Sequence, residues 1–150
     1  MIASRLADLG IVLPPAAAPA FQYVPVTVHE RLAFVSGQLP RNADSLVTGK
    51  LGGELDLQQG REAARLCVLQ ALACLNQALG SLDRVERILK ITGFVASAPG
   101  FNDQPKVIDA ASELLVQIFA EAGKHARSAV GVSELPRNVA VEIELIVALR

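Results

Sequence analysis

The chain has little charge and few aromatic side chains. Of its 150 residues only 19% are charged and 4% are aromatic, and there is no tryptophan. The 14 basic and 15 acidic residues leave a formal net charge of -1, so the basic surface expected of a protein that binds a phosphate backbone is absent. Intrinsic disorder is excluded because disordered chains are poor in apolar residues, whereas 51% of this chain is apolar. The length predicts one domain with a core of its own.

A long uninterrupted apolar run is also missing. A helix that crosses a membrane needs about 20 apolar residues. Residues 9–29 contain four prolines, and residues 66–82 are interrupted by polar side chains and a glycine. A signal peptide is not expected, because the apolar segment before the first prolines, residues 10–13, is too short. We therefore expect a cytoplasmic protein without membrane contact, whose surplus of apolar surface is buried between copies of the chain.

Only two cysteines are present, and they occupy one helical segment. Cys67 and Cys74 would lie roughly 10 Å apart along a helix axis at 1.5 Å per residue, which is too far for a disulfide bond. Neither stands at metal-ligand spacing from His29 or His125. We expect buried, unreactive thiols and no metal site.

The apolar periodicity predicts an α+β fold. A short helix at about residues 2–9 and a Pro/Ala connector form an N-terminal segment, residues 1–20, ahead of a domain at 21–150. The domain is expected to contain two long helices, 57–79 and 103–122, and five strands, 22–28, 31–38, 88–96, 127–132 and 139–149. Strands that alternate with two long helices favour one mixed sheet with both helices on one face.

The last predicted strand carries information on both of its faces. Every odd position from 139 to 149 is apolar, so this row should face the helices. The even positions hold Ala140, Glu142, Glu144, Ile146 and Ala148, which is more apolar than a solvent-exposed face usually is. Since the chain offers no third long helix, we infer that another subunit covers this second face.

Nucleotide-binding glycine patterns, a nucleophile elbow and paired histidine ligands are all absent. Three features remain: Arg127 at the start of a strand, Glu142 in the middle of the last strand, and the small-residue corner Ser36-Gly37. Each also has a structural interpretation. Arg127 would form a surface or interface ion pair, for example with Glu142 or Glu144. Glu142 would be a buried ion-pair partner, and Ser36-Gly37 would be a bend. Tyr23, the only tyrosine, would be a packing residue.

Three segments carry a resemblance to a known family. They read F-V-S-G-Q at 34–38, I-T-G-F-V at 91–95, and A-R-S at 126–128 followed by L-P at 135–136 and V-A-V-E-I-E at 139–144. The sequence resembles the YjgF/Rid family of reactive-intermediate imine deaminases, also described as L-PSP endoribonuclease-like. It is similar to a longer subfamily that carries an N-terminal extension.

The resemblance implies a chorismate-mutase-like α+β fold assembled as a homotrimer, with a barrel-like core of sheets and clefts between subunits. It implies hydrolysis of 2-imino or enamine acids to 2-keto acids and ammonia, without a metal or cofactor. By position, Glu142 would activate the attacking water and Arg127 would clamp the substrate carboxylate with its planar fork. The pocket would also be lined by Tyr23, Ser36, Gly37 and, through its backbone carbonyl, Ala129.

The sequence departs from the family pattern at three places. Ala129 stands where many members have cysteine, His125 replaces a proline, and the segment Asp109 to Ser112 replaces an asparagine and an aromatic residue. These changes predict a different substrate specificity or a loss of activity. A non-catalytic regulator that binds keto or amino acids is therefore the alternative function. An endoribonuclease is less favoured, because the chain has only four lysines and no aromatic platform.

Overall fold

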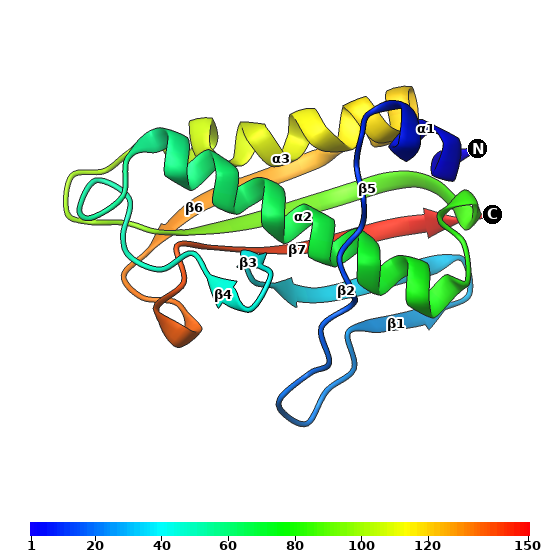
Figure 1. The fold of residues 1–150 in the computed structure, drawn as a ribbon, viewed down its shortest axis with the longest axis horizontal. Helices are drawn as coiled ribbons and strands as arrows, with labels where there is room; N and C mark the ends of the chain where they lie inside the picture. Colours follow the sequence, from blue (N-terminus) through cyan, green and yellow to red (C-terminus); the bar gives the residue numbers. More distant parts are fainter.

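The computed structural model describes all 150 residues and contains one mixed five-stranded sheet. The strands lie in the order β1-β2-β7-β5-β6, and only β5 and β6 run parallel. Both long helices, α2 and α3, cover the same face of the sheet (Figure 1). The predicted fold class is thereby confirmed. The elements are α1 (Ile2–Asp8), β1 (Val26–His29), β2 (Leu32–Gln38), β3 (Arg41–Asn42), β4 (Ser45–Leu46), α2 (Leu57–Leu79), β5 (Val85–Ala96), α3 (Gln104–Phe119), β6 (Ala126–Val132) and β7 (Val141–Leu149).

Helix α2 has the bounds that its sequence predicts. The Asp56 side chain accepts a hydrogen bond from the Gln59 backbone N–H (2.8 Å), and the Gln59 side chain accepts one from the Asp56 N–H (2.9 Å). This reciprocal cap satisfies two donors that a helix start leaves free. The helix ends at Gly80, whose φ of +80° is readily adopted only by glycine. No helix of the chain is both long and apolar enough to cross a membrane.

Several predicted element bounds are wrong by a few residues. The first strand begins at Val26 and not at residue 22, because Pro25 has no N–H to donate to a strand ladder. Strand β5 begins at Val85, three residues earlier than predicted, and β7 begins two residues later than predicted. Helix α3 ends at Phe119 and tightens into a 3-10 turn over 120–123. The predicted loop at 44–53 contains β4, which forms a small hairpin with β3.

The two faces of the sheet differ as β7 predicts. All odd residues from Val139 to Leu149 are buried beneath the helices. The opposite face carries no helix, and the even residues of β7 are at most partly buried there, whereas Ala140, immediately before the strand, is buried. Large apolar side chains on this face are also exposed, to between 37% and 44%: Leu32, Phe34 and Val130. We refer to this helix-free side as the open face.

The N-terminal segment packs onto the domain. The Ile2 N–H donates to Asp83 Oδ1 (2.7 Å) and Arg5 Nε donates to the Gln117 carbonyl (2.8 Å), which fixes α1 against α3 and the turn after α2. The chain then crosses α2 in an extended path and reaches β1 at the other side of the molecule (Figure 1). The connector thus lies close to the end of β2, where four of the six predicted site residues gather.

Candidate functional site

A β-bulge in β2 opens the candidate site. The register between β2 and β7 shifts between Val35 and Gln38, so Ser36 and Gly37 leave the regular ladder. Two hydrogen bonds fix the bulge: Ser36 Oγ donates to the Val24 carbonyl (2.7 Å) and Gln38 Nε2 donates to the Ser36 carbonyl (3.0 Å). The first of these bonds also holds the segment that carries Tyr23.

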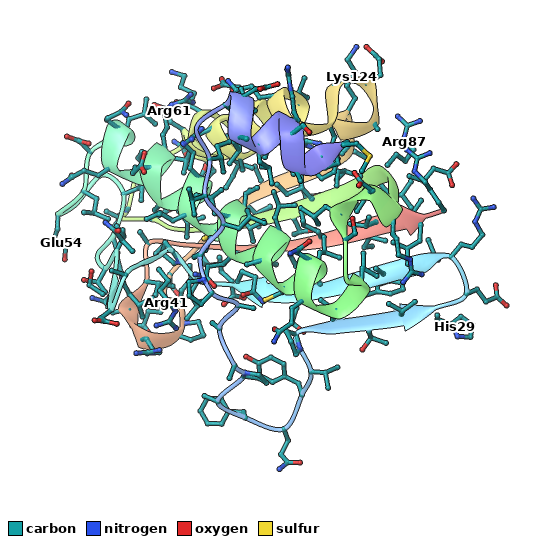
Figure 2. The ribbon with its side chains drawn as sticks, turned by 45° about the vertical axis from the view of Figure 1, so that its right-hand side comes forward. His29, Arg41, Glu54, Arg61, Arg87 and Lys124 are labelled. Atoms are coloured by element: carbon teal, nitrogen blue, oxygen red, sulfur yellow. The ribbon has the colours of Figure 1, made fainter.

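A cleft of about 540 Å³ lies beside this bulge. Tyr23, Ser36, Gly37 and Glu142 all line it, so the structure brings together four of the predicted site residues. Tyr23 is half-exposed and is not a core packing residue. The connector at 17–21, Gln70 on α2, Arg41, Arg137 and Glu144 are among the other residues that line it. Arg41 lies beside the corner between β6 and β7, whereas His29 lies at the far β1–β2 turn (Figure 2).

Gly37 leaves room for the Glu142 carboxylate. A Cβ atom at position 37 would lie 2.6 Å from Glu142 Oε2, closer than real Cβ atoms approach other atoms. Any other residue would therefore displace the carboxylate or the strand. The small-residue corner has a steric function in the cleft and is more than a bend.

The Glu142 carboxylate has no partner in the chain. It takes part in none of the five ion pairs, so its interpretation as a buried ion-pair partner is wrong. Burial raises the pKa of Glu142 above its ordinary value, and the nearby negative charge of Glu144 raises it further. A carboxylate that is costly to ionise and faces a cleft is suited to take up a proton during a reaction.

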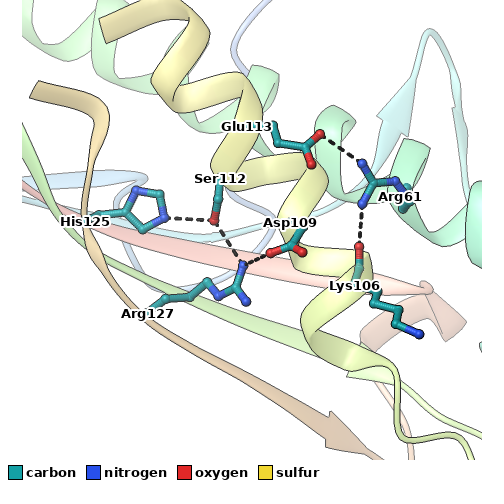
Figure 3. Close-up of polar contacts among 7 residues, drawn as sticks. All are labelled: Arg61, Lys106, Asp109, Ser112, Glu113, His125 and Arg127. Carbon is teal, nitrogen blue, oxygen red and sulfur yellow. Dashed lines mark hydrogen bonds and ion pairs between the residues drawn. The ribbon is translucent and has the colours of Figure 1, made fainter. Parts of the chain in front are cut away.

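Arg127 lies on the other face of the sheet. In the β5–β6 pairing it is in register with Ile91, which is fully buried beneath the helices, and Ala129 is in register with Gly93. Arg127 Nη1 donates to Asp109 Oδ1 (2.7 Å) and to Ser112 Oγ (3.2 Å), both on α3 (Figure 3). Arg127 thus forms an ion pair, as its structural interpretation predicts, but the partner is Asp109. The example partners Glu142 and Glu144 are wrong, since those carboxylates lie on the open face. Within one chain, neither Arg127 nor Ala129 reaches the cleft.

A chain of hydrogen bonds orients the Arg127 guanidinium. His125 Nδ1 lies 2.6 Å from the Gly123 carbonyl, so it donates, and in the neutral ring Nε2 is left as an acceptor. Ser112 Oγ, 2.9 Å away, then donates to Nε2 and accepts from Arg127. Nε and Nη2 of Arg127 form no hydrogen bond within the chain, so two donors stay available for a bidentate carboxylate. No cluster of three or more metal-ligating side chains is present.

Both cysteines are free and buried, as predicted. Burial raises the pKa of both thiols, and the charge of Glu142 raises that of Cys67 further. Thiols held in this neutral state are poor nucleophiles.

The sequence-based predictions missed Gln70 as a residue of the cleft. Its polar side chain among the buried positions of α2 is nevertheless a signal in the sequence.

The comparison with protein families agrees with this architecture. A family model described as "YjgF/chorismate mutase-like, putative endoribonuclease" matches residues 3–149. The chain belongs to the YjgF family. The family resemblance expected from the three sequence segments is confirmed, and the match also includes most of the N-terminal segment.

Individual relatives of this YjgF-family chain cover nearly its whole length. It is 46% identical to protein TCP17 of Trypanosoma cruzi, over 99% of the chain and 94% of that protein. It is 30% identical to a 2-iminobutanoate/2-iminopropanoate deaminase of Dermatophagoides farinae, over 91% of the chain and 92% of that enzyme. The crystal structure of protein Atu1372 from Agrobacterium tumefaciens, of unknown function, superposes with a TM-score of 0.92 at 44% identity, covering 99% of this chain and 92% of that one.

Proposed function

We propose that the chain hydrolyses 2-imino or enamine acids to 2-keto acids and ammonia. The observation that carries this proposal is the unpartnered Glu142 carboxylate, whose pKa is raised and which faces the cleft beside Gly37. The similarity to a named 2-iminobutanoate/2-iminopropanoate deaminase supports it.

The chemistry follows from a carboxylate that holds water next to an electrophilic carbon. Glu142 accepts a proton from the water as the water oxygen bonds to C2 of the imine. That proton passes to the nitrogen and gives a carbinolamine. The proton of its C2 hydroxyl group then moves to the nitrogen through Glu142, the C–N bond breaks, and ammonia leaves as the C2 carbonyl forms. Water and imine are consumed, keto acid and ammonia are produced, and Glu142 returns to its ionised form. Because a general base works best when its pKa approaches the operating pH, the raised pKa of Glu142 favours the step.

A neighbouring copy of the chain would supply the carboxylate clamp. Glu142 and Arg127 point from opposite faces of one sheet, so one chain does not present both to one ligand. We therefore propose a homotrimer in which the open faces pack together and Arg127 of one copy serves the cleft of the next. The exposed apolar side chains of the open face support such packing. Sedimentation at micromolar concentration should give a trimer, and a stable monomer would contradict the shared site.

The activity is tested by supplying imines made in situ from amino acids by an amino acid oxidase. The protein should accelerate release of ammonia and 2-keto acid above the rate of spontaneous hydrolysis. If it binds 2-keto acids but accelerates no imine, the regulatory alternative holds and the deaminase proposal fails.

The pH dependence of the reaction should report the charge of Glu144. That charge raises the pKa of Glu142, so the Glu144→Gln variant should ionise Glu142 at a lower pH. The acidic limb of kcat/KM should accordingly move to lower pH, while the rate on the alkaline plateau stays close to that of the wild type. If the acidic limb of kcat/KM stays at the same pH in Glu144→Gln, that limb does not reflect the ionisation of Glu142.

A further inference from the structure

The Gln70 amide is buried and unpaired. The residue is 2% exposed, and its Oε1 is the only buried side-chain nitrogen or oxygen in the chain that lacks a hydrogen-bond partner. A buried amide without a hydrogen-bond partner lowers the stability of a fold, so the unpaired Gln70 side chain calls for a functional explanation.

The position of Gln70 places its side chain next to the proposed chemistry. On α2 it lies three residues after Cys67 and four before Cys74, so the three side chains share one face of the helix. The Cys67 thiol is close enough to Glu142 for that charge to raise its pKa, and Cys74 Sγ lies 3.6 Å from Gln38 Oε1. Gln70 is the one residue of α2 that lines the cleft, together with Glu142 and the Ser36-Gly37 bulge.

We propose that the Gln70 amide binds the C2 substituent of the ligand. This inference rests on the proposed function and adds a residue to its site. An amide suits both ends of the reaction: its oxygen accepts the N–H of a 2-imino acid, and its NH₂ group donates to the C2 oxygen of a 2-keto acid. The N–H of a 2-imino acid then supplies the donor that Oε1 lacks within the chain, and a 2-keto acid engages the NH₂ group of the same amide.

A leucine replacement separates this role from a structural one. Leucine has a similar volume and no polar group, so in Gln70→Leu the melting temperature should equal or exceed that of the wild type. The affinity for 2-oxobutanoate, measured by calorimetry, should fall about 5- to 10-fold, the loss of roughly one hydrogen bond. Gln77→Leu, the same change at an exposed position on the same helix, should leave the affinity unchanged.

Two outcomes overturn the role of Gln70 alone. One is a Gln70→Leu variant with wild-type affinity and wild-type kcat/KM, and the other is a clearly lowered melting temperature, which would assign the amide to the fold. The wild type reports separately on the proposed function. If it neither binds 2-oxobutanoate nor accelerates imine hydrolysis, the deaminase and the ligand contact both fail.

Discussion

Replacing Glu142 with glutamine is expected to slow imine hydrolysis by at least about 10²-fold, the usual loss when a general base is removed. Glutamine keeps the size of the side chain and its place beside Gly37, but it does not take the proton of the attacking water. The loss should appear in kcat, measured as ammonia release at saturating imine. The matched control is Glu144→Gln, which removes the neighbouring charge and should keep turnover. Turnover of Glu142→Gln within a few-fold of the wild type would refute the assignment.

The same substitution should make the fold more stable at neutral pH. Because the pKa of Glu142 is raised in the folded chain, the native state loses stability as the pH rises from the ordinary pKa of a glutamate to this raised pKa, and the loss is complete above it. Below the ordinary pKa of a glutamate, about 4.3, the carboxyl is neutral in both states and glutamine brings no gain. The difference in free energy of unfolding should therefore grow from pH 4 to pH 7, as followed by urea denaturation. If Glu142→Gln raises the stability of the fold while it lowers activity, Glu142 is present for function and not for folding.

Replacing Arg127 with alanine is expected to raise KM by about 10²-fold, because the substrate carboxylate loses charge-assisted hydrogen bonds. Lysine should restore only part of the affinity, since it lacks the planar fork. Initial rates over a range of imine concentrations would give KM, and calorimetry with 2-oxobutanoate would give the affinity.

The control for Arg127 is Arg61. It forms a similar ion pair, with Glu113 at 2.9 Å, and its side chain is 26% exposed against 24% for Arg127 (Figure 3). Each alanine variant should lose at most about 1 kcal/mol of stability, as partly exposed ion pairs do, but only Arg127→Ala should lose affinity. Since Arg127→Ala also leaves Asp109 unpaired, the double variant with Asp109→Asn tests whether repulsion contributes. Equal affinity loss in Arg61→Ala would show a general effect on the fold.

Local patterns in the sequence predicted most of the fold. The alternation of β7 indicated which residues face the helices, and Gly80 marked the end of α2. Strand starts were less predictable, because the first residues of β5 carry no apolar alternation and are fixed by pairing with β7. The apolar residues at the even positions of β7 also indicated that the open face has no cover from its own chain. That another subunit covers it stays a prediction.

The candidate site was predictable only in part. Tyr23, Ser36, Gly37 and Glu142 gather in one cleft, but that Arg127 faces α3 depends on the parallel register of β5 and β6, which no local pattern encodes. The Arg127–Asp109 ion pair likewise joins β6 to α3, so it depends on tertiary packing that no local pattern encodes. Gln70 is different, since a polar residue among buried helix positions is visible in the sequence, while its lack of a partner is visible only in three dimensions.

The most direct test of the account combines two impaired variants in one oligomer. At an imine concentration below KM, Arg127→Ala through its raised KM and Glu142→Gln through its lowered kcat should each keep only about 1% of the wild-type rate. If Arg127 of one copy serves the Glu142 cleft of another, co-expression and purification through two different tags should restore activity. Every trimer that carries both tags pairs an intact Glu142 with an intact Arg127 in one of its three sites, so about a third of the wild-type rate is expected. If the rate of the mixed oligomers is no higher than that of the separate variants, a deaminase site shared between chains is contradicted.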